Sequence, residues 1–224
     1  MKLNKTILII GGMGPTASQF AHKLILEKCT RKGIAKNNDF PTIIHISINV
    51  EDFIDANSEK YEDGFNYIAE KLSLIEMSKI DTGFIACNTA HVLFERINDK
   101  CGNKLVSIVD ESGKSISQKD KIGIVCTPFT ATHNIYSVKD MVIPDDEQFL
   151  QLNIIIRNVI KGKITDKILY EFSKIIDSLL DEGCNKIIIG CTELSILADK
   201  VKTRFPKNTF IDPIQIAAER IING

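Results

Sequence analysis

Two cysteines hold the same kind of position in separate parts of the chain. Cys87 follows the apolar run at 84–86 and precedes Asn-Thr, while Cys191 follows the run KIIIG at 186–190 and precedes Thr-Glu. Asn and Thr are favoured where helices begin, so each cysteine is expected where a strand gives way to a helix. A helix N-terminus lowers the pKa of a thiol from about 8.5 toward neutrality, which suits acid–base chemistry.

The two cysteine units are separated by nearly half of the 224 residues. In an open α/β sheet, ligands bind at the carboxyl ends of the strands. A duplicated strand–Cys–helix unit therefore predicts two thiols that face each other across one cleft. We expect both sulfur atoms to flank that cleft, with room for a substrate carbon between them.

Burial without function is the alternative for any cysteine, because free cysteine is among the most buried residue types. This alternative weakens for Cys87 and Cys191, which end two matched strands. It remains the expectation for the other four cysteines, which are Cys29, Cys101, Cys126 and Cys184.

Two further uses of the thiols fit the sequence less well. Cys87 and His91 are spaced i, i+4, but the sequence has no CxxC or HxxxH to complete a zinc site, so no metal is expected. A single thiol nucleophile with His91 or His133 as its base would leave the second matched cysteine unexplained.

The GGMGP loop near the start of the chain raises a separate question. Gly12, Gly14 and Ala17 match the dinucleotide pattern G-x-G-x-x-A. That pattern also needs an acidic residue at the end of the second strand. This chain has Asn49 there, and Pro15 interrupts the loop. We therefore predict a tight turn that uses glycine for backbone reasons, and no nicotinamide cofactor.

The elements that would position these groups alternate along the chain. Apolar runs predict strands, and apolar residues at helical spacing predict helices. The expected strands lie at 6–10, 42–48, 84–86, 104–109, 121–125, 141–143, 186–190 and 209–211, and the expected helices at 16–29, 61–79, 90–97, 149–160, 164–181 and 213–222. This alternation predicts an α/β fold with parallel sheets. A polar stretch at 111–119 is expected to separate two halves.

The composition is that of an ordinary globular protein, with 44% hydrophobic residues, 25% charged residues and a net charge of −1. This balance points to neither nucleic acid nor an anionic membrane surface as a partner. The apolar run at 7–10 is too short for a signal peptide or a membrane span. A cytoplasmic location with reduced cysteines is therefore expected.

Three segments resemble the cofactor-independent aspartate/glutamate racemases, and most closely their aspartate racemase branch. They are ACNTAH at 86–91, GCTEL at 190–194 and the GGMGP loop. The resemblance covers most of the chain. It implies two similar three-layer α/β halves with parallel sheets, related by a pseudo-twofold, with the active site in the cleft between them. It also implies a homodimer and a small amino-acid substrate.

In that family the closing helix returns to pack on the first half. The resemblance thus implies a first half made of residues 1–114 plus 208–224, and a second half made of residues 115–207.

The resemblance further implies a racemase in which Cys87 and Cys191 are opposed acid and base groups at Cα. One thiolate removes the proton from one face while the other thiol protonates the opposite face. Without pyridoxal phosphate, nicotinamide or metal, the carbanion is stabilised through its own carboxylate, which N–H groups at helix N-termini can hold. By the same resemblance, the substrate contacts are Met13, Asn88, Thr89, Thr127, Thr130, Lys161 and Thr192.

The residues for side-chain specificity depart from the family. Aspartate racemases carry Pro-Asp-Arg after the second strand, whereas this chain reads NVEDFIDA at 49–56. The position of the Arg falls at Asp55, and the acidic segment from Glu51 to Asp55 contains no Arg or Lys. A carboxylate does not pair with a substrate carboxylate. Lys161 is then the remaining cationic contact, and aspartate is expected to be a poor substrate unless Lys161 compensates.

Two other functions stay open. One is a cysteine-dependent isomerase or decarboxylase of a dicarboxylic acid, and the other is a non-catalytic protein that binds a small acid. Entry of solvent deuterium at Cα of a free amino acid would separate a racemase from both.

Overall fold

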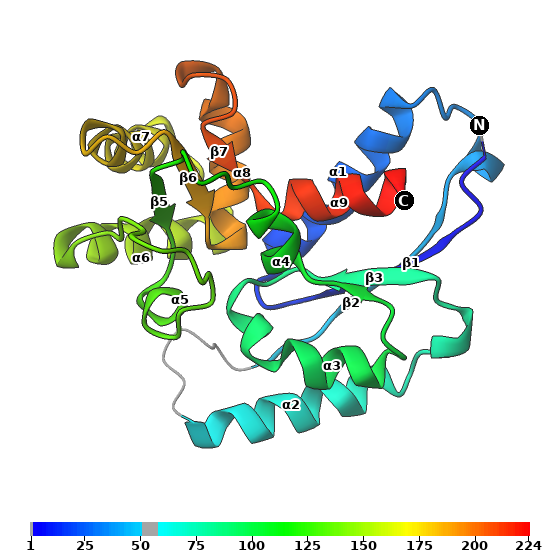
Figure 1. Ribbon diagram of the computed structural model, residues 1–224. Helices are drawn as coiled ribbons and strands as arrows, with labels where there is room; N and C mark the ends of the chain where they lie inside the picture. Colours follow the sequence, from blue (N-terminus) through cyan, green and yellow to red (C-terminus); the bar gives the residue numbers. More distant parts are fainter. Residues whose placement is uncertain (1, 51–57) are drawn as a thin grey trace.

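The computed structural model describes residues 2–50 and 58–224. These residues form two parallel sheets with helices packed against them (Figure 1). No helix within these two ranges is both long and apolar enough to cross a membrane. The α/β class with parallel sheets that the sequence predicts is confirmed.

The first sheet has the strand order β2-β1-β3-β4. Its strands are β1 (Thr6–Gly11), β2 (Thr42–Ser47), β3 (Thr82–Ile85) and β4 (Leu105–Val106). The central strand β1 is buried on both faces, as is typical of parallel strands. Ile7 and Ile9 lie in one core cluster, whereas Leu8 and Ile10 lie in another.

Helices cover both faces of this sheet. On one face, α1 (Pro15–Arg31) and α9 (Pro213–Asn223) share a core cluster with the sheet. On the other face, α2 (Ser58–Leu72) and α3 (Phe94–Lys100) do the same. The C-terminal helix α9 also packs on α4 (Ile108–Gly113), so the end of the chain lies on the first half (Figure 1).

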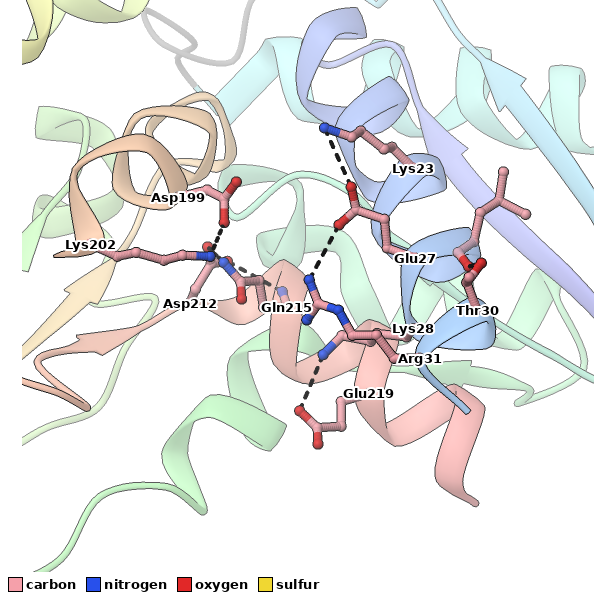
Figure 2. Close-up of polar contacts among 11 residues, drawn as sticks. Lys23, Glu27, Lys28, Thr30, Arg31, Asp199, Lys202, Asp212, Gln215 and Glu219 are labelled. Carbon is pink, nitrogen blue, oxygen red and sulfur yellow. Dashed lines mark hydrogen bonds and ion pairs between the residues drawn. The ribbon is translucent and has the colours of Figure 1, made fainter. Parts of the chain in front are cut away.

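An ion pair joins α1 and α9 at the surface. Lys28 Nζ lies 3.2 Å from Glu219 Oε2 (Figure 2). The Glu219 side chain is exposed, so the pair contributes at most about 1 kcal/mol. The core cluster that Phe20 of α1 shares with Ile221 of α9 is therefore the stronger source of stability.

The second sheet has the order β5-β6-β7. Its strands are β5 (Ile122–Val125), β6 (Lys186–Ile189) and β7 (Phe210–Ile211). Three long helices share a core cluster with Ile187 and Ile189 of this sheet. These helices are α6 (Asp146–Ile160), α7 (Asp166–Asp181) and α8 (Thr192–Val201).

The segment at 208–224 contacts both sheets. The predicted division places it in the first half, and within it β7 pairs with β6 of the second sheet. Only α9 lies on the first half, so the chain crosses between halves after Ile211. Asp212 marks this crossing: its Oδ1 accepts the N–H of Ile214 at 3.1 Å and caps α9.

The helix expected at 61–79 is shorter than predicted. It ends at Leu72, where the Ser73 hydroxyl donates to the Glu70 carbonyl at 2.6 Å. A separate 3-10 turn, Met77–Lys79, follows. A serine that bonds the backbone of the last turn competes with helix continuation, which apolar spacing does not reveal.

The strand expected at 104–109 is also shorter, because Ser107 starts a helix. Its hydroxyl accepts the N–H of Asp110 at 3.1 Å and caps α4. The helix expected at 90–97 opens as a 3-10 helix, Thr89–Leu93, before α3.

Candidate active site

The two sheets end in the same way beside the two cysteines. After β3, the Ala86 N–H donates to the Ile10 carbonyl, and after β6 the Gly190 N–H donates to the Val125 carbonyl, both at 2.8 Å. The next residue in each case is one of the two cysteines. The duplicated strand–Cys unit expected from the sequence is therefore present in the backbone.

The Cys191 thiol lies in a setting that disfavours its charged form. Burial raises the pKa of this thiol well above its ordinary value, and the charges of Glu193 and Cys87 raise it further.

Both cysteines are nearly buried. Cys87 is 6% exposed and Cys191 is 7% exposed. The surroundings are nevertheless polar, since six buried hydrophilic side chains lie next to the cysteines in sequence or in the matching turn. They are Asn88, Thr89, Thr127, Thr130, Thr192 and Glu193.

The expected lowering of the thiol pKa by a helix N-terminus is wrong for Cys191. Although Cys191 is the N-cap of α8, burial and the adjacent Glu193 raise its pKa instead. Desolvation disfavours the thiolate, and the helix dipole does not compensate for it here.

Glu193 is the main site residue that the sequence analysis missed. It is 5% exposed, and burial raises the pKa of its carboxyl group. Its Oε2 accepts the Cys191 thiol at 3.1 Å and the Thr192 hydroxyl at 3.3 Å. Its Oε1 accepts the N–H of Gly14 at 3.1 Å, which joins the second half to the GGMGP loop of the first.

The GGMGP loop needs its glycines for close approach. Gly12 has a φ of +95°, and a Cβ there would lie 2.3 Å from the Ile48 nitrogen. A Cβ on Gly14 would lie 2.2 Å from Glu193 Oε1. Met13, between these glycines, is partly buried against the core cluster that contains Cys87.

Asn88 is held by a residue from the second half. Tyr136 donates its hydroxyl to Asn88 Oδ1, and the two side chains are 2% and 1% exposed. Burial raises the pKa of Tyr136 well above its ordinary value, and the charges of Asp212, Cys126 and Cys191 raise it further.

Three threonine hydroxyls meet where the two halves come together. Thr89 Oγ1 lies 3.4 Å from Thr130 Oγ1, which lies 3.2 Å from Thr127 Oγ1. Thr127 also caps α5 (Pro128–Thr132), with its hydroxyl accepting the Thr130 N–H at 3.3 Å. The structure thus brings together these three predicted substrate contacts.

His91 supports the backbone of Cys87. Its Nε2 accepts the Ile108 N–H at 3.2 Å, so Nδ1 carries the hydrogen and donates to the Cys87 carbonyl at 2.8 Å. Burial lowers the pKa of His91 to about 4. His91 is therefore neutral near pH 7 and holds Cys87 in place rather than acting as its base.

The structure leaves the predicted contact for a distal carboxylate apart from the buried polar cluster. Lys161 is exposed at the C-terminal end of α6. The acidic segment from Glu51 to Asp55 lies outside the described residues. Within the described part of the chain, no three His, Cys, Asp or Glu side chains are grouped to hold a metal ion.

Comparison with known proteins gives a family match over nearly the whole chain. The model of the family described as "Asp/Glu/Hydantoin racemase" matches residues 10–221. A glutamate racemase from Trichodesmium erythraeum (strain IMS101) is 24% identical over 161 residues, which cover 68% of this chain and 58% of that protein. The chain thus spans less than two thirds of this relative.

Solved structures share the fold. The aspartate racemase of Picrophilus torridus superposes with a TM-score of 0.77 at 24% identity, covering 98% of this chain and 94% of that one. An aspartate racemase homologue from Pyrococcus horikoshii OT3 gives 0.73 at 24% identity, with 98% of each chain covered. The resemblance that the cysteine segments carry is confirmed.

Proposed function

Because the chain belongs to the Asp/Glu/hydantoin racemase family, we propose that it is an isomerase that racemises a free amino acid without a bound cofactor. Cys87 and Cys191 are the opposed acid and base groups at Cα. The observation that supports this proposal is that the two thiols end two matched strands and that buried polar side chains follow both of them.

Two opposed groups suit racemisation for a geometric reason. Loss of the Cα proton gives a nearly planar intermediate, and a single base tends to return the proton to the face it came from. A second acid on the opposite face removes this limit. Exchange of the two roles then serves the opposite enantiomer.

Glu193 supplies a route to the thiolate in a site that disfavours charge. Transfer of the Cys191 proton to Glu193 Oε2, 3.1 Å away, gives a thiolate and a neutral carboxyl group without changing the net charge. The raised pKa of Glu193 favours this transfer, whereas the raised pKa of Cys191 opposes it, so the thiolate forms only during turnover. Glu193 therefore acts as the proton acceptor for Cys191.

The proton balance closes over one turnover. The Cys191 thiolate takes the Cα proton, the electron pair moves into the α-carboxylate, and the Cys87 thiol delivers its proton to the other face. The chain then holds a neutral Glu193 and a thiolate at Cys87. Proton exchange with water between turnovers restores the starting state.

The buried hydroxyls and the Asn88 amide hold the substrate carboxylate in this proposal. Thr89, Thr127 and Thr130 already form one hydroxyl cluster. Fixed donors in a closed site stabilise a developing charge more strongly than water does. The proposal also includes the two halves of the chain and the homodimer that the family resemblance implies.

The direct test is a screen of free L-amino acids in deuterated buffer without added cofactor. The proposal expects loss of optical activity together with deuterium at Cα for at least one amino acid. A dicarboxylic-acid isomerase or decarboxylase, or a binding protein, would give neither signal with any amino acid. That result would end the racemase assignment.

A further inference from the structure

The side-chain amide of Asn88 has only one of its two ends in use. Asn88 follows Cys87 and is 1% exposed. Its Oδ1 accepts the Tyr136 hydroxyl, whereas its Nδ2 has no hydrogen-bond partner within residues 2–50 and 58–224. A buried donor without a partner costs about 1–3 kcal/mol, so a use for it in a ligand complex is expected.

Tyr136 determines which end of the amide is available. A side-chain carboxamide can rotate so that its acceptor oxygen and its donor nitrogen exchange places. Burial raises the pKa of Tyr136, so its hydroxyl keeps its proton and needs an acceptor. The hydroxyl therefore selects Oδ1, and Nδ2 is left as the donor beside Cys87.

We propose that Tyr136 is a positioning residue that orients Asn88 so that its Nδ2–H binds the α-carboxylate of the substrate. This inference rests on the proposed function for the choice of ligand. A carboxylate only accepts hydrogen bonds and so matches a lone N–H donor. Charge moves onto that carboxylate as the Cα proton leaves, which strengthens the bond in the transition state.

The pair also links the two halves. Asn88 follows β3 of the first sheet, whereas Tyr136 lies in the core cluster of Ile124 and Ile188 in the second. The donor is thus oriented only when the halves are together.

The test is a double-mutant cycle between Tyr136→Phe and Asn88→Ala. The probe is 2-aminoisobutyrate, which has an α-carboxylate but no Cα proton, so that binding is measured apart from chemistry. Tyr136→Phe should weaken binding about tenfold in the wild-type background and have no further effect in Asn88→Ala. Equal losses in both backgrounds, or no loss in the wild type, would overturn the proposal.

A matched control uses the other tyrosine hydroxyl that bonds across the halves. Tyr61 lies 3.1 Å from His133 Nε2 and has no recorded contact with Asn88. Tyr61→Phe should therefore show the same effect on binding, if any, with and without Asn88. Coupling of Tyr61 to Asn88 as strong as that of Tyr136 would count against a specific orienting role.

Two further readouts keep the proposal testable. If Tyr136→Phe does not fold, the Asn88 side-chain resonances in a ¹H–¹⁵N spectrum of the wild type replace it. Saturating 2-aminoisobutyrate should shift them, and unchanged resonances would refute the contact. Failure of the proposed function is seen separately, as absent Cα deuterium exchange with every amino acid while binding and coupling persist.

Discussion

The Cys191 thiol donates to Glu193 Oε2 at 3.1 Å, and both side chains are buried. The contact joins a weak acid to a carboxylate whose own ionisation is disfavoured by burial. Burial and the charge of Glu193 also raise the pKa of Cys191, so the proton rests on the thiol. In the proposed mechanism, its transfer to Glu193 during turnover lets the buried thiol act as a base.

Glu193→Gln should leave the shape of the site intact and remove the proton acceptor. We expect kcat to fall by about 10²–10³, because general base catalysis is worth that much. Cα deuterium exchange with each enantiomer measures the loss. Cys184→Ser, at a buried position outside the site, is the control and should lose much less. Equal losses would mean that Glu193 acts only through packing.

The same variant has a pH-dependent effect on stability. Because burial raises the pKa of Glu193 in the folded state, its contribution is present at low pH and is lost as the pH rises above the usual carboxyl range. Glu193→Gln should therefore gain stability relative to wild type between acid and neutral pH. Urea unfolding across this range measures the difference, and a relative loss instead would contradict the raised pKa.

Gly14→Ala should disrupt the bridge between the halves. The added Cβ would lie 2.2 Å from Glu193 Oε1, so the loop or the carboxylate must move. We expect about 1–3 kcal/mol of destabilisation and a loss of turnover. Gly113→Ala in α4 is the control, because its Cβ meets nothing within 4 Å. Comparable unfolding midpoints for the two variants would argue against the bridge.

His91 should make the folded protein sensitive to acid. Its folded pKa of about 4 lies below the ordinary value of 6.5, so its contribution is present above pH 6.5 and is lost as the pH falls toward 4. The wild type should lose up to about 3 kcal/mol from this source. His91→Gln should flatten the decline in unfolding experiments, and His22→Gln should not.

The duplicated cysteine units could be predicted from the sequence because their signals are local. An apolar run, a cysteine and a helix-favouring Asn-Thr or Thr-Glu lie within a few residues, and buried parallel strands give such runs. The same locality explains the confirmed fold class. Errors occurred where a single serine, such as Ser73 or Ser107, ended or began an element.

The remaining site residues could not be predicted because their roles depend on distant partners. Glu193 looks like an ordinary acidic residue in the first turn of a helix, and its bond to Gly14 spans 179 residues. Tyr136 reaches Asn88 only because the two sheets come together. The raised pKa of Cys191 likewise follows from burial, which a strand-end pattern does not reveal.

Specificity for the substrate side chain should depend on the cationic residue of the protein that faces the distal carboxylate of the substrate. The sequence places Asp55 where aspartate racemases carry Arg, and Lys161 is exposed on α6. Asp55→Arg should raise the kcat/KM for L-aspartate relative to neutral amino acids. If aspartate is instead the best substrate of the wild type and Lys161→Ala is harmless, the assignment of this position is wrong.

Replacing each thiol separately should separate the proton transfers at the two faces of Cα. Cys87→Ser and Cys191→Ser should each abolish full racemisation, because each leaves one face of Cα without a suitable acid. The surviving thiol still reaches the other face, so each variant should exchange the Cα proton of one enantiomer with deuterated solvent, and the two variants should favour opposite enantiomers. Cys184→Ser, at a buried cysteine outside the site, should retain both exchanges. Equal loss of both exchanges in each variant would leave the fold intact and would favour one shared nucleophile over two opposed bases.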